Sequence, residues 1–141
     1  MKTVGVLALQ GDFAAHQQAI ERAGGRAIEV RTAAELALCD GLIVPGGEST
    51  AMLKLLDREG MAGPIQHFAE QKPIYGSCAG AILLAREVTN PPQPCLGLLD
   101  IAVERNAYGR QIDSRIARLP MTEGGDLEAV FIRAPIIRRV G

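Results

Sequence analysis

The sequence predicts an α/β fold in three layers, an open and mostly parallel sheet with helices on both faces. Apolar runs of strand length alternate with helical patterns from the amino terminus onward. These runs are continuous, as expected of parallel strands that are buried on both faces. At 141 residues and 48% hydrophobic content, the chain is long enough for one domain with its own core.

The amino-terminal half follows the order strand, helix, strand, helix, strand. Strands are expected over residues 3–9, 27–30 and 42–44. Asp12 is a plausible N-cap for the first helix. Thr32 and Glu35 have the spacing of a capping box, which would open a second helix that buries Leu36 and Leu38.

Residues 72–85 are the stretch around which the chain is organised. They predict a short strand over 73–75, a turn of small residues, and a helix that opens near Ala79. Residues 76–80, Gly-Ser-Cys-Ala-Gly, have the G-x-nucleophile-x-G spacing of a nucleophile elbow. Free N–H groups at the helix start would favour a Cys78 thiolate, so Cys78 is a candidate nucleophile. The alternative is a small apolar cysteine packed in the core.

A second turn of small residues follows the third expected strand. Residues 45–50 read Pro-Gly-Gly-Glu-Ser-Thr, and Ser49 could cap a helix that runs to about Asp57. This is either an ordinary strand-to-helix turn or part of a ligand site, because open α/β folds bind ligands at the carboxyl ends of their strands. If the two turns face each other, one could offer N–H donors to a carbonyl that the other attacks.

The carboxyl-terminal half is less regular. Residues 90–94 form a proline-rich loop, and strands are expected over 98–103, 114–119 and, buried, over 130–133. Residues 104–111 form a polar loop with Arg105 and Arg110, which could hold an amino acid by its α-carboxylate or could simply be solvated. The sequence stops at residues 136–141, and this end looks like an interruption and not a designed terminus. Cys95 has no apparent partner and is interpreted as structural.

Composition excludes several classes of protein. The net charge of −1 and the lack of a broad basic patch argue against nucleic-acid binding. No apolar run approaches the roughly 18 residues of a membrane span, and no signal peptide is apparent. The three cysteines lack metal-ligand spacing, so neither a metal site nor a disulfide framework is expected, and a reducing cytoplasm is the simplest compartment.

Five motifs together resemble the glutaminase subunits of pyridoxal phosphate synthase. That family belongs to the class I (triad) glutamine amidotransferases, with a flavodoxin-like sheet. The motifs occur in the family's order and cover essentially the whole chain, at residues 5–11, 45–50, 76–80, 104–111 and 131–135. The second and third motifs alone would indicate only the wider glutaminase class, whereas the last two point to the vitamin B6 enzyme.

The resemblance implies hydrolysis of L-glutamine to glutamate and ammonia, with the ammonia passed to a partner synthase subunit in a hetero-oligomer. It implies that Cys78 attacks the carboxamide and that the N–H groups of Gly47 and Ala79 stabilise the oxyanion. Gln10 would help to organise the site on complex formation, and no cofactor is implied. The residues implied to hold glutamine are Gly47, Glu48, Ser49, Arg105, Ile132 and Arg133.

The sequence departs from the family at the triad. The family's His and Glu lie in a Phe-His-Pro-Glu type motif beyond residues 131–135, and the histidines of this sequence are His16 and His67, neither in that context. We therefore expect residues 1–141 to be one glutamine amidotransferase domain that lacks its carboxyl-terminal segment. The alternatives are a catalytically inactive module that binds or regulates the synthase and, more distantly, a DJ-1-like protein.

Overall fold

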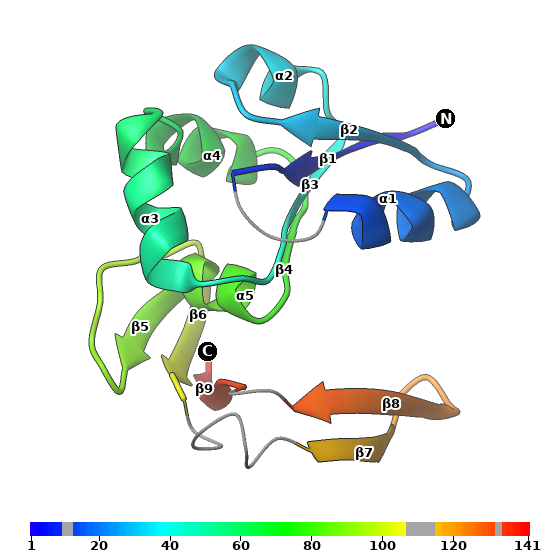
Figure 1. Ribbon diagram of the computed structural model, residues 1–141, viewed down its shortest axis with the longest axis vertical. Coiled ribbons are helices and arrows are strands. Elements are labelled where there is room, and N and C mark those ends of the chain that lie inside the picture. Colours follow the sequence, from blue (N-terminus) through cyan, green and yellow to red (C-terminus); the bar gives the residue numbers. More distant parts are fainter. Residues whose placement is uncertain (10–12, 107–114, 132–133) are drawn as a thin grey trace.

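A four-stranded parallel sheet forms the centre of the computed structural model, which describes residues 1–9, 13–106, 115–131 and 134–141 (Figure 1). The strand order is β2-β1-β3-β4. Gly5 in β1 pairs with Ile28 in β2 and with Leu42 in β3. The strands are β1 (Thr3–Leu7), β2 (Arg26–Val30), β3 (Gly41–Val44) and β4 (Ile74–Gly76). The predicted open parallel sheet is confirmed.

Helices cover both faces of this sheet, as predicted. On one face, α1 packs against β1 and β2 and buries Ile20. On the other face, α2, α3 and α4 surround a common apolar core (Figure 1). The helices are α1 (Phe13–Arg22), α2 (Ala33–Ala37), α3 (Ser49–Arg58), α4 (Ala62–Ala69) and α5 (Ala79–Leu84).

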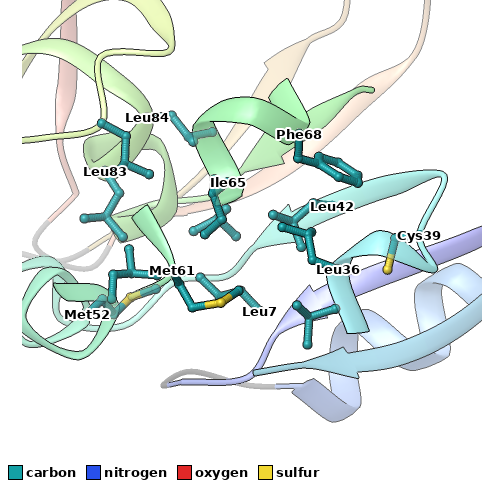
Figure 2. Packing of buried hydrophobic residues seen from close by; sticks show 14 of the residues in the cluster. Leu7, Leu36, Cys39, Leu42, Met52, Met61, Ile65, Phe68, Leu83 and Leu84 are labelled. Carbon is teal, nitrogen blue, oxygen red and sulfur yellow. The ribbon is translucent and has the colours of Figure 1, made fainter. Parts of the chain in front are cut away.

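The main core joins the sheet to the helices of that second face. Figure 2 shows Leu7 and Leu42 of the sheet among side chains of α2 and α4, including Leu36 and Ile65. Ile65 and Leu7 are 0% and 1% exposed. Burial of each such side chain contributes about 1.5–3 kcal/mol, which fixes the carboxyl end of the sheet against α3 and α4.

A smaller sheet follows α5 in the chain. Its order is β5-β6-β9, with β5 parallel to β6 and β9 antiparallel to it. An antiparallel ribbon of β7 and β8 lies beyond it (Figure 1). The strands are β5 (Ala85–Thr89), β6 (Leu99–Glu104), β7 (Arg115–Pro120), β8 (Asp126–Phe131) and β9 (Ile136–Val140).

Some local predictions are confirmed and others are wrong. The capping box is present, since Thr32 Oγ1 accepts from the Glu35 N–H at 3.2 Å and the Glu35 carboxylate accepts from the Thr32 N–H at 2.9 Å. Leu38 was predicted to be buried but is 71% exposed. It forms the C-cap of α2, where the chain leaves the helix and its side chain turns away from the core. Asp12 lies outside the described residues.

The larger errors concern the second half of the chain. Strand β5 was not predicted, yet it begins directly after α5 ends at Leu84. Strand β9, which lies within residues 136–141, was not predicted either. The strand expected over 130–133 is β8, which starts earlier, and its Leu127 is 49% exposed because the ribbon has only two strands.

Within the described ranges, no helix is both long enough and apolar enough to cross a membrane.

Candidate active site

Cys78 lies in the sharp turn between β4 and α5. Its backbone has φ 50° and ψ −111°, a conformation that non-glycine residues rarely adopt. Such strain persists only where the surrounding structure enforces it, and it is typical of functional turns. The thiol is exposed at the carboxyl end of the strand. The backbone therefore has the shape of the predicted nucleophile elbow.

Gly76 and Gly80 permit this turn for a steric reason. A Cβ on Gly76 would lie 2.7 Å from the carbonyl carbon of Gly80. A Cβ on Gly80 would overlap the carbonyl oxygen of Val44 and lie 2.7 Å from its carbon. The two glycines thus allow α5 to pack directly on the ends of β3 and β4, which presents Cys78 to solvent.

The turn after β3 faces the elbow. A Cβ built on Gly46 would lie 3.6 Å from the Cβ of Cys78, which is ordinary contact distance. Gly47 has φ 142°, a backbone conformation that side chains disfavour. The β3–β4 pairing of Val44 with Gly76 places the two turns side by side. The sequence-based expectation that they could face each other therefore matches the geometry.

A cavity of about 300 Å³ opens between the two turns. Its walls include most of the predicted site residues, and Ile82 and Asn106 were not among those predicted. Gln10, Ile132 and Arg133 lie outside the described residues, as does Arg110. The lining residues are Gly47, Glu48, Ser49, Cys78, Ala79, Ile82, Arg105 and Asn106.

Arg105 is held at the cavity wall by side chains from two other segments. Its guanidinium donates from Nη1 to Gln93 Oε1 at 2.8 Å and from Nη2 to Thr50 Oγ1 at 3.3 Å. Nη2 also lies 3.5 Å from Glu48 Oε1. Only 13% of the Arg105 side chain is exposed, so the polar loop after β6 is not simply solvated at this residue.

Gln93 is a part of this arrangement that the sequence-based analysis missed. Besides accepting from Arg105, its Oε1 accepts from Thr50 Oγ1 at 3.1 Å, and its Nε2 donates to Ser49 Oγ at 3.2 Å. The sequence offered one signal, a polar residue between two prolines in a loop otherwise without apparent purpose. No local pattern reveals contacts to residues more than forty positions away.

The N-cap of α3 is Glu48, and the prediction of Ser49 is wrong. The Glu48 carboxylate accepts from the Thr50 N–H at 3.1 Å and from the Ala51 N–H at 2.7 Å. Ser49 is the first helical residue and is 3% exposed, with its hydroxyl accepting from Gln93. A carboxylate cap is favourable because it also faces the positive end of the helix dipole.

These contacts lower the pKa of Glu48. Partial burial raises it, but the N–H groups of Ala51 and Thr50 and the charge of Arg105 outweigh this effect and bring the pKa below its ordinary value of 4.5. A lowered folded-state pKa stabilises the fold above the ordinary value, and this stabilisation is lost as the pH falls through the folded value.

We expect Glu48→Gln to lower the free energy of unfolding. The difference from the unaltered chain should be largest near neutral pH and should shrink below pH 4.5. Chemical unfolding at several pH values measures this difference. Glu123→Gln, in the exposed β7–β8 turn, is the matched control and should show a small difference at all pH values. A Glu48→Gln difference that does not depend on pH would contradict the assignment of the cap.

The two histidines lie away from the cavity. His16 is half-buried on α1, and His67 is exposed on α4 with its Nδ1 3.3 Å from a Glu70 carboxylate oxygen. Neither lines the cavity around Cys78. Among the residues that the structure describes, no cluster of three or more His, Cys, Asp or Glu side chains could hold a metal ion.

An open parallel sheet with a cysteine at a strained elbow, opposite a glycine-rich turn, is the arrangement of the class of α/β proteins that carry a nucleophile elbow. Comparisons narrow this class, because residues 6–141 match a sequence family described as the SNO glutamine amidotransferase family. The chain belongs to the SNO glutamine amidotransferase family.

Individual relatives agree with this assignment. The chain is 58% identical to the pyridoxal 5'-phosphate synthase subunit PdxT of Solibacter usitatus, covering 99% of this chain and 77% of that protein. It is 54% identical to the subunit of the same name from Deinococcus radiodurans, covering 99% and 74%. A crystal structure of a glutamine amidotransferase matches with a TM-score of 0.89 and 48% identity, covering 98% of this chain and 75% of that chain.

Proposed function

We propose that this chain hydrolyses L-glutamine to L-glutamate and ammonia through a thioester on Cys78. The observation that carries the proposal is the elbow itself, which directs an exposed thiol into a cavity opposite the Gly46-Gly47 turn. Membership of a glutamine amidotransferase family supports this choice among the possible acyl transfers. The motifs at residues 45–50, 104–111 and 131–135 favour this family over the more distant DJ-1-like proteins.

In the proposed reaction, the Cys78 thiolate attacks the carboxamide carbon of glutamine. The N–H groups of Gly47 and Ala79 donate to the oxyanion that forms. The C–N bond then breaks, ammonia leaves with a proton, and a thioester remains. Water attacks the thioester, which releases glutamate and returns the thiol.

These proton transfers need a general base, and an imidazole is the usual one. His16 and His67 do not fill this role, since neither lines the cavity. The resemblance assigns the role to the histidine of a Phe-His-Pro-Glu type motif, which residues 1–141 do not contain. The cavity residues of this chain supply the nucleophile, the oxyanion donors and the substrate contacts.

We propose that Arg105 binds the α-carboxylate of glutamine, because a guanidinium pairs with a carboxylate through two hydrogen bonds. Glu48 and Ser49 line the same cavity and would contact the amino-acid portion. The resemblance adds Ile132 and Arg133 as further contacts for glutamine, and Gln10 as a residue that helps to organise the site when the partner docks.

We further propose that the ammonia passes to a synthase subunit that makes pyridoxal 5'-phosphate, in a hetero-oligomer in the cytoplasm. The relatives above are named as subunits of that synthase. Chemistry supports a direct transfer, because ammonia released into water near pH 7 is mostly protonated and then is no nucleophile. A free-thiol nucleophile also suits a reducing compartment.

A chloroketone analogue of L-glutamine should alkylate Cys78 and spare the other cysteines. Cys78 is exposed, whereas burial raises the pKa of the Cys39 thiol and of the Cys95 thiol. Peptide mass spectrometry locates the label, and excess L-glutamine should slow the labelling. Preferential labelling of Cys39 or Cys95 would contradict the proposal.

A glutamate-release assay on the complete gene product with its synthase subunit distinguishes an active enzyme from an inactive binding module. Release that depends on glutamine supports the proposed function. Normal docking with no release would favour the inactive module.

A further inference from the structure

We propose that Gln93 is a positioning residue that fixes the Arg105 guanidinium for the α-carboxylate of glutamine. This inference rests on the proposed function, because it assigns Gln93 a part in binding the same substrate. Gln93 is not among the residues that line the cavity, so it would act through Arg105 and not through contact with the substrate.

The hydrogen bonds determine how the Gln93 amide is oriented. Arginine can only donate, so the atom 2.8 Å from Arg105 Nη1 must be the amide oxygen, Oε1. The amide nitrogen then donates to the Ser49 hydroxyl at 3.2 Å. Thr50 donates to the same oxygen at 3.1 Å. One amide therefore joins the start of α3 to the segment that follows β6, the two segments that supply the proposed substrate contacts.

Gln93 is itself well anchored. It lies between Pro92 and Pro94, whose rings restrict the backbone of the loop. Just beyond, the Leu96 N–H donates to the Leu83 carbonyl oxygen at 2.8 Å, and Leu96 is 7% exposed. The loop is thus attached to the end of α5, so Gln93 is held in place and can fix the position of the Arg105 side chain.

The negative charge of Glu48 explains why Arg105 needs the hydrogen bond to Gln93 to keep its position. Without Gln93, the acceptors left to Arg105 among its described contacts are Thr50 and Glu48. The Glu48 carboxylate carries a full charge and lies 3.5 Å from Nη2, so the guanidinium would turn toward it. A substrate carboxylate would then have to compete with Glu48 and to reorder the arginine, and both effects weaken binding.

The test measures ligand binding by calorimetry, both for the chain alone and for the chain with its synthase subunit. All variants carry Cys78→Ala, which prevents turnover. Gln93→Met keeps the side-chain length but removes the amide. We expect it to weaken L-glutamine binding about tenfold, as for loss of a hydrogen bond to a charged group. Binding of 4-aminobutanamide, which is glutamine without its α-carboxylate, should change less than about twofold.

Two further variants distinguish a specific effect on the position of Arg105 from a general destabilisation of the loop. Gln66→Met removes a different hydrogen bond to the same loop, from Nε2 to the Leu96 carbonyl oxygen, and should leave glutamine binding unchanged. In an Arg105→Ala background, Gln93→Met should cause no additional loss, because residues that act as a unit are not additive. If Gln93→Met fails to fold, Thr50→Val removes a hydroxyl of the same network and should weaken glutamine binding about threefold.

The outcomes distinguish this inference from the proposed function. If the Cys78→Ala protein with Gln93 intact binds no L-glutamine, either alone or with the synthase subunit, the proposed function fails and the inference fails with it. If glutamine binds but Gln93→Met binds it equally well, the inference alone is wrong. An equal loss for both ligands would also overturn it, since that result indicates a disrupted cavity.

Discussion

Replacing Cys78 by alanine is expected to lower glutamate release by the complete enzyme by about four orders of magnitude or more. The substitution removes the atom that forms the thioester in the proposed reaction. The fold should persist, because the thiol is exposed and forms no N-cap hydrogen bond. Glutamate release under saturating glutamine measures the effect, and circular dichroism checks the fold.

Cys95→Ser is the matched control for this experiment. The Cys95 thiol is partly buried and donates to the Arg86 carbonyl oxygen at 3.5 Å, away from the cavity. A hydroxyl can make the same bond, so activity should stay within about twofold. Substantial release by Cys78→Ala, or an equal loss in Cys95→Ser, would contradict the role of Cys78.

Replacing Gly80 by alanine is expected to destabilise the fold by about 4 kcal/mol or more. The new Cβ would overlap the carbonyl oxygen of Val44, a backbone atom that cannot rotate away. Because typical domains are stable by about 5–15 kcal/mol, such a loss removes a large share of the stability and should shift unfolding to a much lower denaturant concentration. Denaturant unfolding of the purified chain measures the loss.

Gly63→Ala is the control, because it adds the same methyl group to an exposed helical position where nothing lies within 4 Å apart from its chain neighbours. It should change the free energy of unfolding by no more than about 1 kcal/mol, since the lower backbone entropy cost of alanine is opposed by the restriction that Pro64 places on the preceding residue. If Gly80→Ala unfolds at the same denaturant concentration as the unaltered chain, α5 does not pack on β3 as described.

The strands and turns that the sequence predicts well are those with a local physical cause. The continuous apolar runs of β1 and β3 reflect burial on both faces of a parallel sheet. The spacing of Gly76 and Gly80 reflects the contact of α5 with the strand ends. The capping box at Thr32 is satisfied within four residues. In each case, the chemistry lies within a few positions of the residue concerned.

The two strands that the sequence did not predict depend on distant partners. Strand β5 exposes Arg86 and Glu87 and has little apolar pattern of its own, and it is a strand because it pairs with β6. Strand β9 likewise pairs with β6, and its Arg139 donates to Asp100 of β6 at 3.0 Å. Neither pairing leaves a periodic signal in the segment itself.

The features of the candidate site also fall into two groups, those encoded by a short motif and those that depend on tertiary contacts. By itself, the sequence determined the nucleophile elbow, the glycine turn opposite it and the candidate arginine, because each is encoded by a short motif. Only the tertiary structure decided that Glu48 caps α3 and that Gln93 ties Arg105 to Ser49. Those choices depend on which polar groups meet when the loop after β5 closes over the start of α3, and burial requires that each of them finds a partner.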